Sequence, residues 1–208
     1  MALLSAKACA HCLCNLPSRA HFWARLLVAT VLLLIALTDS SAWLAIADDT
    51  SESLEYRLKA AFLYKFAGYV EWPEAAFPRP DTPLTIGVLG ADAVASELVP
   101  LVAGRTVNNR AVTVRHLKAG EPLTGIHVLL IGKPESARLS PLLAQLQSHA
   151  ILTVTELEGA LSQGSVINFI LADRRVRFEI SLEAAEKHNL KLSSRLLAVA
   201  QQVFTSMP

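Results

Sequence analysis

The residue types that most often carry enzyme chemistry are scattered along this chain rather than gathered into a motif. After residue 47 the histidines stand singly on different predicted elements, at His116, His127, His149 and His188. All three cysteines precede residue 15, so the later sequence offers no thiol nucleophile. The chain also lacks a nucleophile elbow, a phosphate loop and a zinc-binding histidine pair. We therefore expect no catalytic site, no metal site and no cofactor, and hence no enzyme.

Two features point to binding instead of catalysis. The first is a basic cluster of Arg174, Arg175 and Arg177, which is either the solvated tip of a hairpin or a contact for an acidic partner surface. The second is a pair of glycines, Gly90 and Gly132, each directly after an apolar segment. In open α/β sheets the turn that follows a strand is where ligands bind, although one glycine there more often serves only the turn.

The arginine cluster falls inside a predicted β-hairpin. Val176, Phe178 and Ile180 alternate with polar residues, which is the period of two expected of a strand with one buried face. Residues 166–171 are mostly apolar and form the predicted partner strand. The short polar segment 172–175 is the predicted hairpin loop.

Two helices are predicted after the hairpin. The first covers about 182–188, and Asn189 closes it in the left-handed conformation. The second begins at Ser193 or Ser194, either of which can cap it. Its predicted apolar face consists of Leu196, Leu197, Ala200 and Val203.

A long helix predicted over 54–70 is apolar nearly all round. One stripe consists of Leu54, Leu58, Ala61, Phe62 and Tyr69, and the opposite stripe consists of Ala60, Leu63, Tyr64, Ala67 and Val70. Such a helix is either fully buried or packs one face in the fold and the other on a partner. Pro73 ends the helix, so Trp72 lies where the chain changes direction. Its side chain either fills the end of the core or is exposed as an anchor residue of an interface. Tyr69 and Trp72 therefore join the arginine cluster as candidate partner contacts.

Strands and helices alternate in the middle of the chain. Strands are predicted over 84–89, 112–117, 126–131 and 151–154, and helices over 92–102, from Ser136 or Ser140 to about 149, and over 158–161. This alternation indicates an α/β fold. We expect a single domain with a mostly parallel sheet flanked by helices on both faces, and with a C-terminal antiparallel β-hairpin.

The N-terminal segment has the features of a secretory signal peptide. Basic residues up to Arg25 precede an apolar run over 26–37, which is shorter than the roughly 20 residues that span a membrane. Ala45-Ile46-Ala47 is a small-x-small cleavage site. We expect a signal peptide over 1–47 and a mature periplasmic domain over 48–208 that does not span the membrane. An uncleaved membrane anchor is the alternative.

The predicted mature domain is nearly neutral. Of the 19 basic and 18 acidic residues in the whole chain, three basic residues and one acidic residue lie in the leader, which leaves 16 and 17. A formal charge of −1 gives no reason to expect nucleic acid or an anionic membrane surface as the partner.

Both ends of the mature chain resemble the YfiR family. Residues 164–203 contain a Gly-Ser, an I-N-F strand, a strand reading R-F-E-I, a short helix and S-S-R-L-L, and residues 56–73 resemble the family's opening helix with its terminal Trp-Pro. The resemblance covers about 54–203. It implies a non-enzymatic periplasmic signalling protein that binds and represses the periplasmic part of an inner-membrane diguanylate cyclase. Such a repressor controls cyclic di-GMP and biofilm formation.

This sequence departs from the family in its cysteines. Members of the YfiR family often carry internal disulfides that have been linked to redox sensing, and this mature domain has no cysteine. Redox control through its own thiols is therefore excluded once the leader is removed. The resemblance assigns no contact residues, so Tyr69, Trp72 and the three arginines rest on exposure arguments alone.

The second apolar stripe of the long helix is either a partner surface or the interface of a homodimer. One alternative to the repressor hypothesis also stays open. A periplasmic small-molecule-binding sensor domain would instead bind a ligand near Gly90 and Gly132 and act on a membrane kinase or cyclase.

Overall fold

The computed structural model describes the backbone of residues 42–147 and 149–206, and within these ranges the side chains from residue 51 onward. The chain divides into two units, Met1–Thr50 and Ser51–Pro208, and the second carries the α/β fold. The predicted signal peptide falls on the first unit and, up to residue 41, lies outside the described residues. Among the described residues, no helix is long and apolar enough to cross a membrane.

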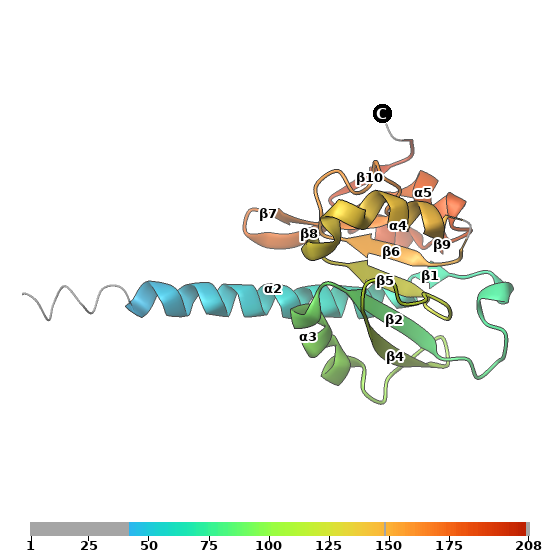
Figure 1. The fold of residues 1–208 in the computed structure, drawn as a ribbon, viewed down its shortest axis with the longest axis horizontal. Helices are drawn as coiled ribbons and strands as arrows, with labels where there is room; N and C mark the ends of the chain where they lie inside the picture. Colours follow the sequence, from blue (N-terminus) through green and yellow to red (C-terminus); the bar gives the residue numbers. More distant parts are fainter. Residues whose placement is uncertain (1–41, 148, 207–208) are drawn as a thin grey trace, which may run out of the picture. The chain divides into compact units, whose positions relative to one another are not determined.

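An eight-stranded sheet forms the middle of the fold (Figure 1), in the order β10-β8-β7-β6-β5-β2-β4-β3. Its parallel strands are β4 (Arg110–Leu117), β2 (Leu84–Leu89), β5 (Val128–Ile131), β6 (Leu152–Thr155) and β7 (Ile167–Ala172). The strand β8 (Arg175–Ser181) is antiparallel to β7, β10 (Gln202–Phe204) is parallel to β8, and β3 (Thr106–Val107) is antiparallel to β4. The predicted mostly parallel sheet with a C-terminal hairpin is confirmed.

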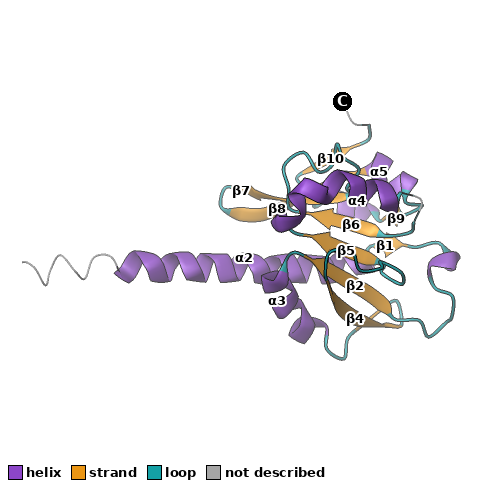
Figure 2. Ribbon diagram, in the orientation of Figure 1, coloured by secondary structure: helices purple, strands orange, loops and turns teal. Residues whose placement is uncertain are grey.

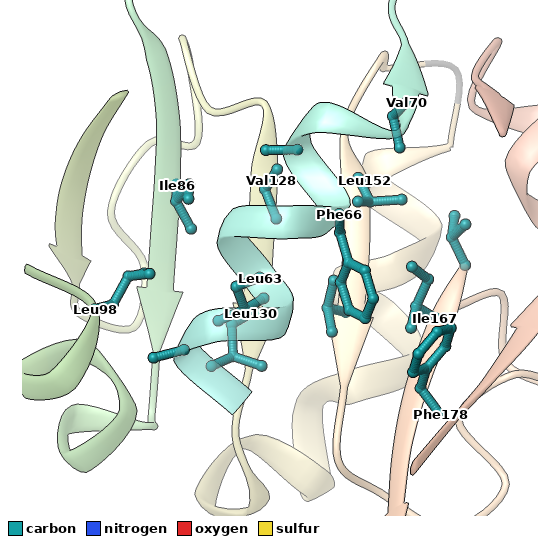
Figure 3. Packing of buried hydrophobic residues seen from close by; sticks show 14 of the residues in the cluster. Leu63, Phe66, Val70, Ile86, Leu98, Val128, Leu130, Leu152, Ile167 and Phe178 are labelled. Atoms are coloured by element: carbon teal, nitrogen blue, oxygen red, sulfur yellow. The ribbon is translucent and has the colours of Figure 1, made fainter. Parts of the chain in front are cut away.

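Helices cover both faces of this sheet, as predicted (Figure 2). The helices α2 (Ala42–Gly68) and α3 (Asp92–Val102) pack on one face, and α4 (Leu139–Leu146) packs on the other. Figure 3 shows α2 lying across the sheet, with Leu63 over Leu130 and Phe66 beside Ile167 and Phe178. Because these side chains are fully buried, α2 is the central element of the larger core.

Shorter elements complete the fold. The strands β1 (Val70–Glu71) and β9 (Lys191–Leu192) form a separate antiparallel pair beside the C-terminal end of α2. The 3₁₀ helices are η1 (Glu74–Ala76) and η2 (Lys133–Arg138), and the short α-helices are α5 (Leu182–Lys187) and α6 (Ser194–Leu197). Asn189 closes α5 with a φ of 56°, so the predicted left-handed cap is confirmed.

The prediction of a last helix that reaches Val203 is wrong for most of its length. Ser193 caps α6 as expected, because its Oγ accepts a hydrogen bond from the Arg195 N–H at 3.2 Å. The helix then ends at Leu197, and Val203 lies in β10 opposite Ile180. Pairing with the exposed edge of β8 therefore decides the conformation of this segment.

Two other predictions need correction. The predicted helix over 158–161 is a series of turns. The helix α2 begins at Ala42 instead of Leu54, because no glycine or proline interrupts residues 42–67. It ends at Gly68, before Pro73, and Val70 lies in β1, where it pairs with Leu192.

Candidate functional site

The hairpin of β7 and β8 presents its arginines to solvent. Asp173 and Arg174 form the turn with φ values of 51° and 58°, the pattern of the two-residue turn that matches the twist of paired strands. Arg174, Arg175 and Arg177 are exposed, whereas Val176 is buried, so the predicted alternation is confirmed. In the described part of the chain, none of the three arginines belongs to an ion pair.

The long helix α2 buries one of its two apolar stripes and exposes the other. Ala60, Leu63 and Ala67 are completely buried under the sheet. On the opposite side Leu54 is 54% exposed and Leu58 is 40% exposed. The second stripe is therefore available to a partner over its N-terminal half.

The exposed leucines of α2 lie on the same side of the sheet as the hairpin tip. Phe62 of α2 contacts Phe169 of β7, with ring centroids 6.1 Å apart. From that contact, Leu58 lies one helical turn toward the N-terminus of α2, and Leu171 lies two residues toward the C-terminus of β7, each about 6 Å away. The two directions are the same in space. Lys59 of α2 contacts Glu156 just after the C-terminal end of β6, and the parallel strand β7 continues beyond that end.

Leu171 is 60% exposed and thus extends the apolar surface of α2 onto the hairpin. We call this surface the α2–hairpin face, and it consists of Leu54, Leu58 and Leu171, with Arg174 at the tip of the hairpin. Arg175 and Arg177 alternate with the buried Val176 and Phe178, so their side chains point to the opposite side of the hairpin. Sequence reasoning missed Leu171. Its signal was an apolar residue at the end of a strand, next to a polar loop.

Tyr69 and Trp72 lie at the other end of α2, away from the arginines. The Tyr69 carbonyl accepts a hydrogen bond from the Ser193 N–H at 2.9 Å, and both aromatic side chains are half-buried. Trp72 packs edge-on against Phe77 and His127, with centroid distances of 6.2 Å and 6.4 Å. The predicted contact residues therefore fall at two separate places on the molecule.

The corner around Trp72 is a stacked cluster. The Phe77 ring stacks on His127 with centroids 4.3 Å apart, and the Arg110 guanidinium lies 4.0 Å from the Phe77 centroid on a cation–π contact. The Trp72 Nε1–H is buried without a hydrogen-bond acceptor among the described residues. This cluster fixes the proline-rich segment 77–83 against the sheet.

Two of the histidines are buried structural residues. His127 accepts a hydrogen bond at Nδ1 from the Thr85 N–H and donates from Nε2 to the Ala76 carbonyl, both at 3.1 Å. His188 donates from Nδ1 to the His149 carbonyl at 2.9 Å. Burial lowers the pKa of His127 and of His188, so both are neutral in the folded protein at pH 7.

A buried ion cluster lies at the carboxyl edge of the parallel strands. Lys59 of α2 is 3% exposed, and its ammonium lies 2.5 Å from Glu55 Oε1 and 2.5 Å from Glu156 Oε2. Burial alone would lower the pKa of Lys59, but its hydrogen bonds to Glu156 and Glu55 outweigh that effect and raise the pKa. Sequence reasoning missed this cluster, although Glu55 and Lys59 have the i, i+4 spacing of a helical pair.

Backbone geometry requires glycine at positions 90 and 132, at the same edge of the sheet. Gly90 has a φ of 69°, and a Cβ added to Gly132 would lie 2.1 Å from the Gly90 carbonyl oxygen. The two turns therefore touch through their backbones, which only glycine permits. A cavity of about 300 Å³ lies beside them, next to Lys59 and Glu156.

Among the residues that the structure describes, no group of histidine, cysteine or acidic side chains has the arrangement of a metal site. His116 lies 4.0 Å from Asp92, but both side chains are mostly exposed.

Comparison with known proteins gives the family. No curated protein matches the chain. One similar solved structure is a conserved domain protein from Vibrio cholerae, which shares 11% sequence identity at a TM-score of 0.42 over 57% of this chain and 54% of that chain. The chain thus spans about half the length of that structure. A profile described as YfiR/HmsC-like matches residues 56–201, which include the central helix, the sheet and the hairpin. The chain belongs to the YfiR/HmsC-like family.

Proposed function

We propose that this protein binds the periplasmic part of an inner-membrane diguanylate cyclase through the α2–hairpin face and represses the enzyme. The family supports the general role, because YfiR/HmsC-like proteins are periplasmic, non-catalytic regulators of cyclic di-GMP signalling. The acting form in this proposal is the mature domain, residues 48–208, after removal of the signal peptide. Repression would lower cyclic di-GMP in the cell and limit biofilm formation.

The observation that carries this proposal is the group of exposed leucines on the α2–hairpin face. Single exposed apolar residues are ordinary on protein surfaces, whereas several together mark interaction sites. Leu54, Leu58 and Leu171 are each at least 40% exposed and come from two elements that pack together through Phe62. Covering them with a partner would remove apolar surface from water at about 25 cal/mol per Å².

The charge on the hairpin also favours an acidic partner. Arg174, Arg175 and Arg177 have no ion-pair partner among the described residues, so their charges are available for a second protein. Arginine is enriched at protein interfaces because its guanidinium can donate two parallel hydrogen bonds to one carboxylate, and because a guanidinium is only weakly hydrated and is therefore less costly to desolvate than an ammonium. We therefore expect carboxylates around an apolar contact on the cyclase.

Repression requires a difference in affinity between two states of the cyclase. A regulator that binds the inactive state about 5.5 kcal/mol more tightly than the active state moves a switch from 1:99 to 99:1. Equal affinity for both states would change nothing, however tight the complex. The interface must therefore include a part of the cyclase that moves between the two states.

Site-specific crosslinking in cells tests the proposal. A photoreactive p-benzoylphenylalanine at Leu58 should crosslink to a membrane protein that has a cytoplasmic cyclase domain, identified by mass spectrometry. The same residue at Val99, an exposed apolar position on α3, is the matched control and should give no such product. If both positions crosslink the cyclase equally, or if neither does, the α2–hairpin face is not the binding surface.

Tyr69 and Trp72 remain a second proposed contact at the opposite end of α2. Their half-burial and the packing of Trp72 on Phe77 and His127 give them a structural role that does not depend on a partner. Trp72→Ala should weaken the complex by about 2 kcal/mol if Trp72 is an interface anchor. Unchanged affinity in a folded Trp72→Ala protein would limit the interface to the α2–hairpin face.

A further inference from the structure

The connection from β4 to β5 crosses the sheet without a helix. Parallel strands are usually joined through a helix that covers the sheet, as α3 does between β2 and β4. Residues 118–127 instead return as a loop over the face on which α4 packs, since Leu117 and Ile126 at its two ends both join the α4 core. Arg115 fastens this loop by donating hydrogen bonds to the Thr124 carbonyl at 3.1 Å and the Pro122 carbonyl at 3.4 Å.

A cavity of about 480 Å³ lies between this loop and α4, where a helix would otherwise fill the space. Leu89, Leu146 and Ile151 line it and are at most 5% exposed. Leu123 of the loop and Leu142 of α4 also line it and are half-buried. Small-molecule sites have this form, with an apolar interior and a volume of about 300–1,000 Å³.

The polar groups of the cavity favour a negative ligand. Lys118 and His149 line the cavity, have exposed side chains and belong to no ion pair in the described part of the chain. Arg138 is already paired with Glu135, which neutralises that carboxylate. The remaining carboxylate, Glu121, is exposed on the same loop as Lys118, so these two side chains offset each other in net charge, and the His149 imidazole adds a hydrogen-bond donor without a matching carboxylate. An ammonium and an imidazole are therefore the groups best placed to receive a ligand's charge.

We propose that this cavity binds a small molecule with an apolar body and a single anionic head, the chemistry of an aliphatic or aromatic carboxylate. The body replaces water over Leu89, Leu146 and Ile151, and the head lies beside Lys118 and His149. The site lies on the α4 face of the sheet, whereas α2 and its exposed leucines belong to the other face. The cavity is therefore separate from the α2–hairpin face, and ligand binding there does not depend on cyclase binding.

A displacement assay on protein purified from cells that express the full chain tests this site. The fluorescent dye 8-anilinonaphthalene-1-sulfonate, an aromatic body with one anionic head, should bind at one site per chain. Octanoate should displace the dye at least about tenfold better than octylamine, because only the carboxylate gains a charge-assisted hydrogen bond. Equal displacement by the two compounds would overturn the assignment of an anionic head.

Substitutions locate the bound dye. Leu123→Asp and Leu142→Asp each change one half-buried lining residue and should weaken dye binding at least about tenfold, the effect of about 1.4 kcal/mol. Lys118→Glu should abolish the preference for octanoate, and Lys191→Glu, at an exposed lysine on β9, should leave it unchanged. Circular dichroism shows which variants fold, and Leu123→Trp, which fills the cavity from the loop, replaces any that do not. Full dye binding by the folded lining variants, or loss of binding in Leu58→Asp on α2, would overturn the proposal.

Discussion

Lys59 shows how one buried side chain holds the central helix in place. It lies on α2 and pairs with Glu55 on the same helix and with Glu156, 97 residues away, at the end of β6. The second oxygen of Glu156 accepts a hydrogen bond from the Lys133 N–H at 3.3 Å. One carboxylate thus links α2 to the ends of two adjacent strands.

Removal of the Lys59 charge should destabilise the fold. Lys59→Met leaves Glu55 and Glu156 facing each other without a cation, and loss of one partner of a buried pair costs about 3 kcal/mol. The pKa of Lys59 is raised above its unfolded value of 10.5, so its contribution is fully present at pH 7 and is lost as pH rises through the folded-state pKa. Urea unfolding at pH 7 measures the loss. Lys65→Met, at an exposed position of the same helix, should change the free energy of unfolding little. An equally small change in Lys59→Met would contradict a stabilising role for the Lys59 ion cluster.

The two buried histidines should make the fold sensitive to acid. Their pKa values are lowered by burial, so the unfolded chain binds protons at a higher pH than the folded chain does. Stability is therefore complete above the unfolded pKa of 6.5 and is lost as pH falls below it, by up to about 1.4 kcal/mol per pH unit for each group. Arg110, which lies over Phe77 and thus near His127, further lowers the pKa of His127.

Unfolding free energies measured between pH 7.5 and pH 5 test this sensitivity. His127→Asn keeps an acceptor near the Thr85 N–H but cannot titrate, so its stability should depend less on pH than that of the wild type. His116→Asn changes an exposed histidine and should keep the wild-type dependence. A parallel loss of stability in His127→Asn and wild type would exclude His127 as a source of the pH dependence.

The β7–β8 hairpin is held by a turn that suits glycine better than arginine. Asp173 tolerates its φ of 51°, but Arg174 adopts a φ of 58° without a side-chain hydrogen bond among the described residues. The left-handed conformation costs an L-residue roughly 1 kcal/mol. Arg174 therefore retains an unfavourable backbone conformation in an exposed turn.

Arg174→Gly should stabilise the protein by about 0.5 kcal/mol, because the relief of backbone strain exceeds the entropy that glycine adds to the unfolded chain. Thermal unfolding measures the shift in Tm. Arg177→Gly, in the middle of β8, is the matched control and should destabilise, since glycine weakens a strand. A lower Tm for Arg174→Gly would show that the arginine side chain, and not the backbone, stabilises the turn.

Local periodicity predicted most elements of this fold, and long-range contacts decided the rest. The alternation of Val176 and Phe178 fixed β8, and the sequence places α3 within a residue of its observed bounds. The apolar spacing of the segment that includes Val203 predicts a helix, and its pairing with Ile180 makes it a strand instead. Lys59 and its partner Glu156 are 97 residues apart, so no local pattern reveals the pair. The choice between the two stripes of α2 likewise depends on the sheet, which forms from later residues.

The molecule as a whole carries different features on the two faces of its sheet. On one face α2 fills the core with one stripe and exposes the other beside the arginine hairpin. On the other face, α4 and the helix-free loop 118–127 leave a cavity over apolar side chains of the sheet. Protein binding and small-molecule binding are therefore proposed for separate surfaces, and each can be removed by substitution without the other.

Cyclic di-GMP in the bacterium that encodes this protein tests the proposed repression most directly. We would delete the gene and restore it as wild type, as a Leu58→Asp and Leu171→Asp double variant, and as a Val99→Asp control. Mass spectrometry would then measure cyclic di-GMP in strains with equal periplasmic amounts of each protein. Deletion should raise cyclic di-GMP, wild type and Val99→Asp should lower it again, and the double variant should not. A double variant that represses as well as wild type, or a deletion that leaves cyclic di-GMP unchanged, would contradict the proposed repression.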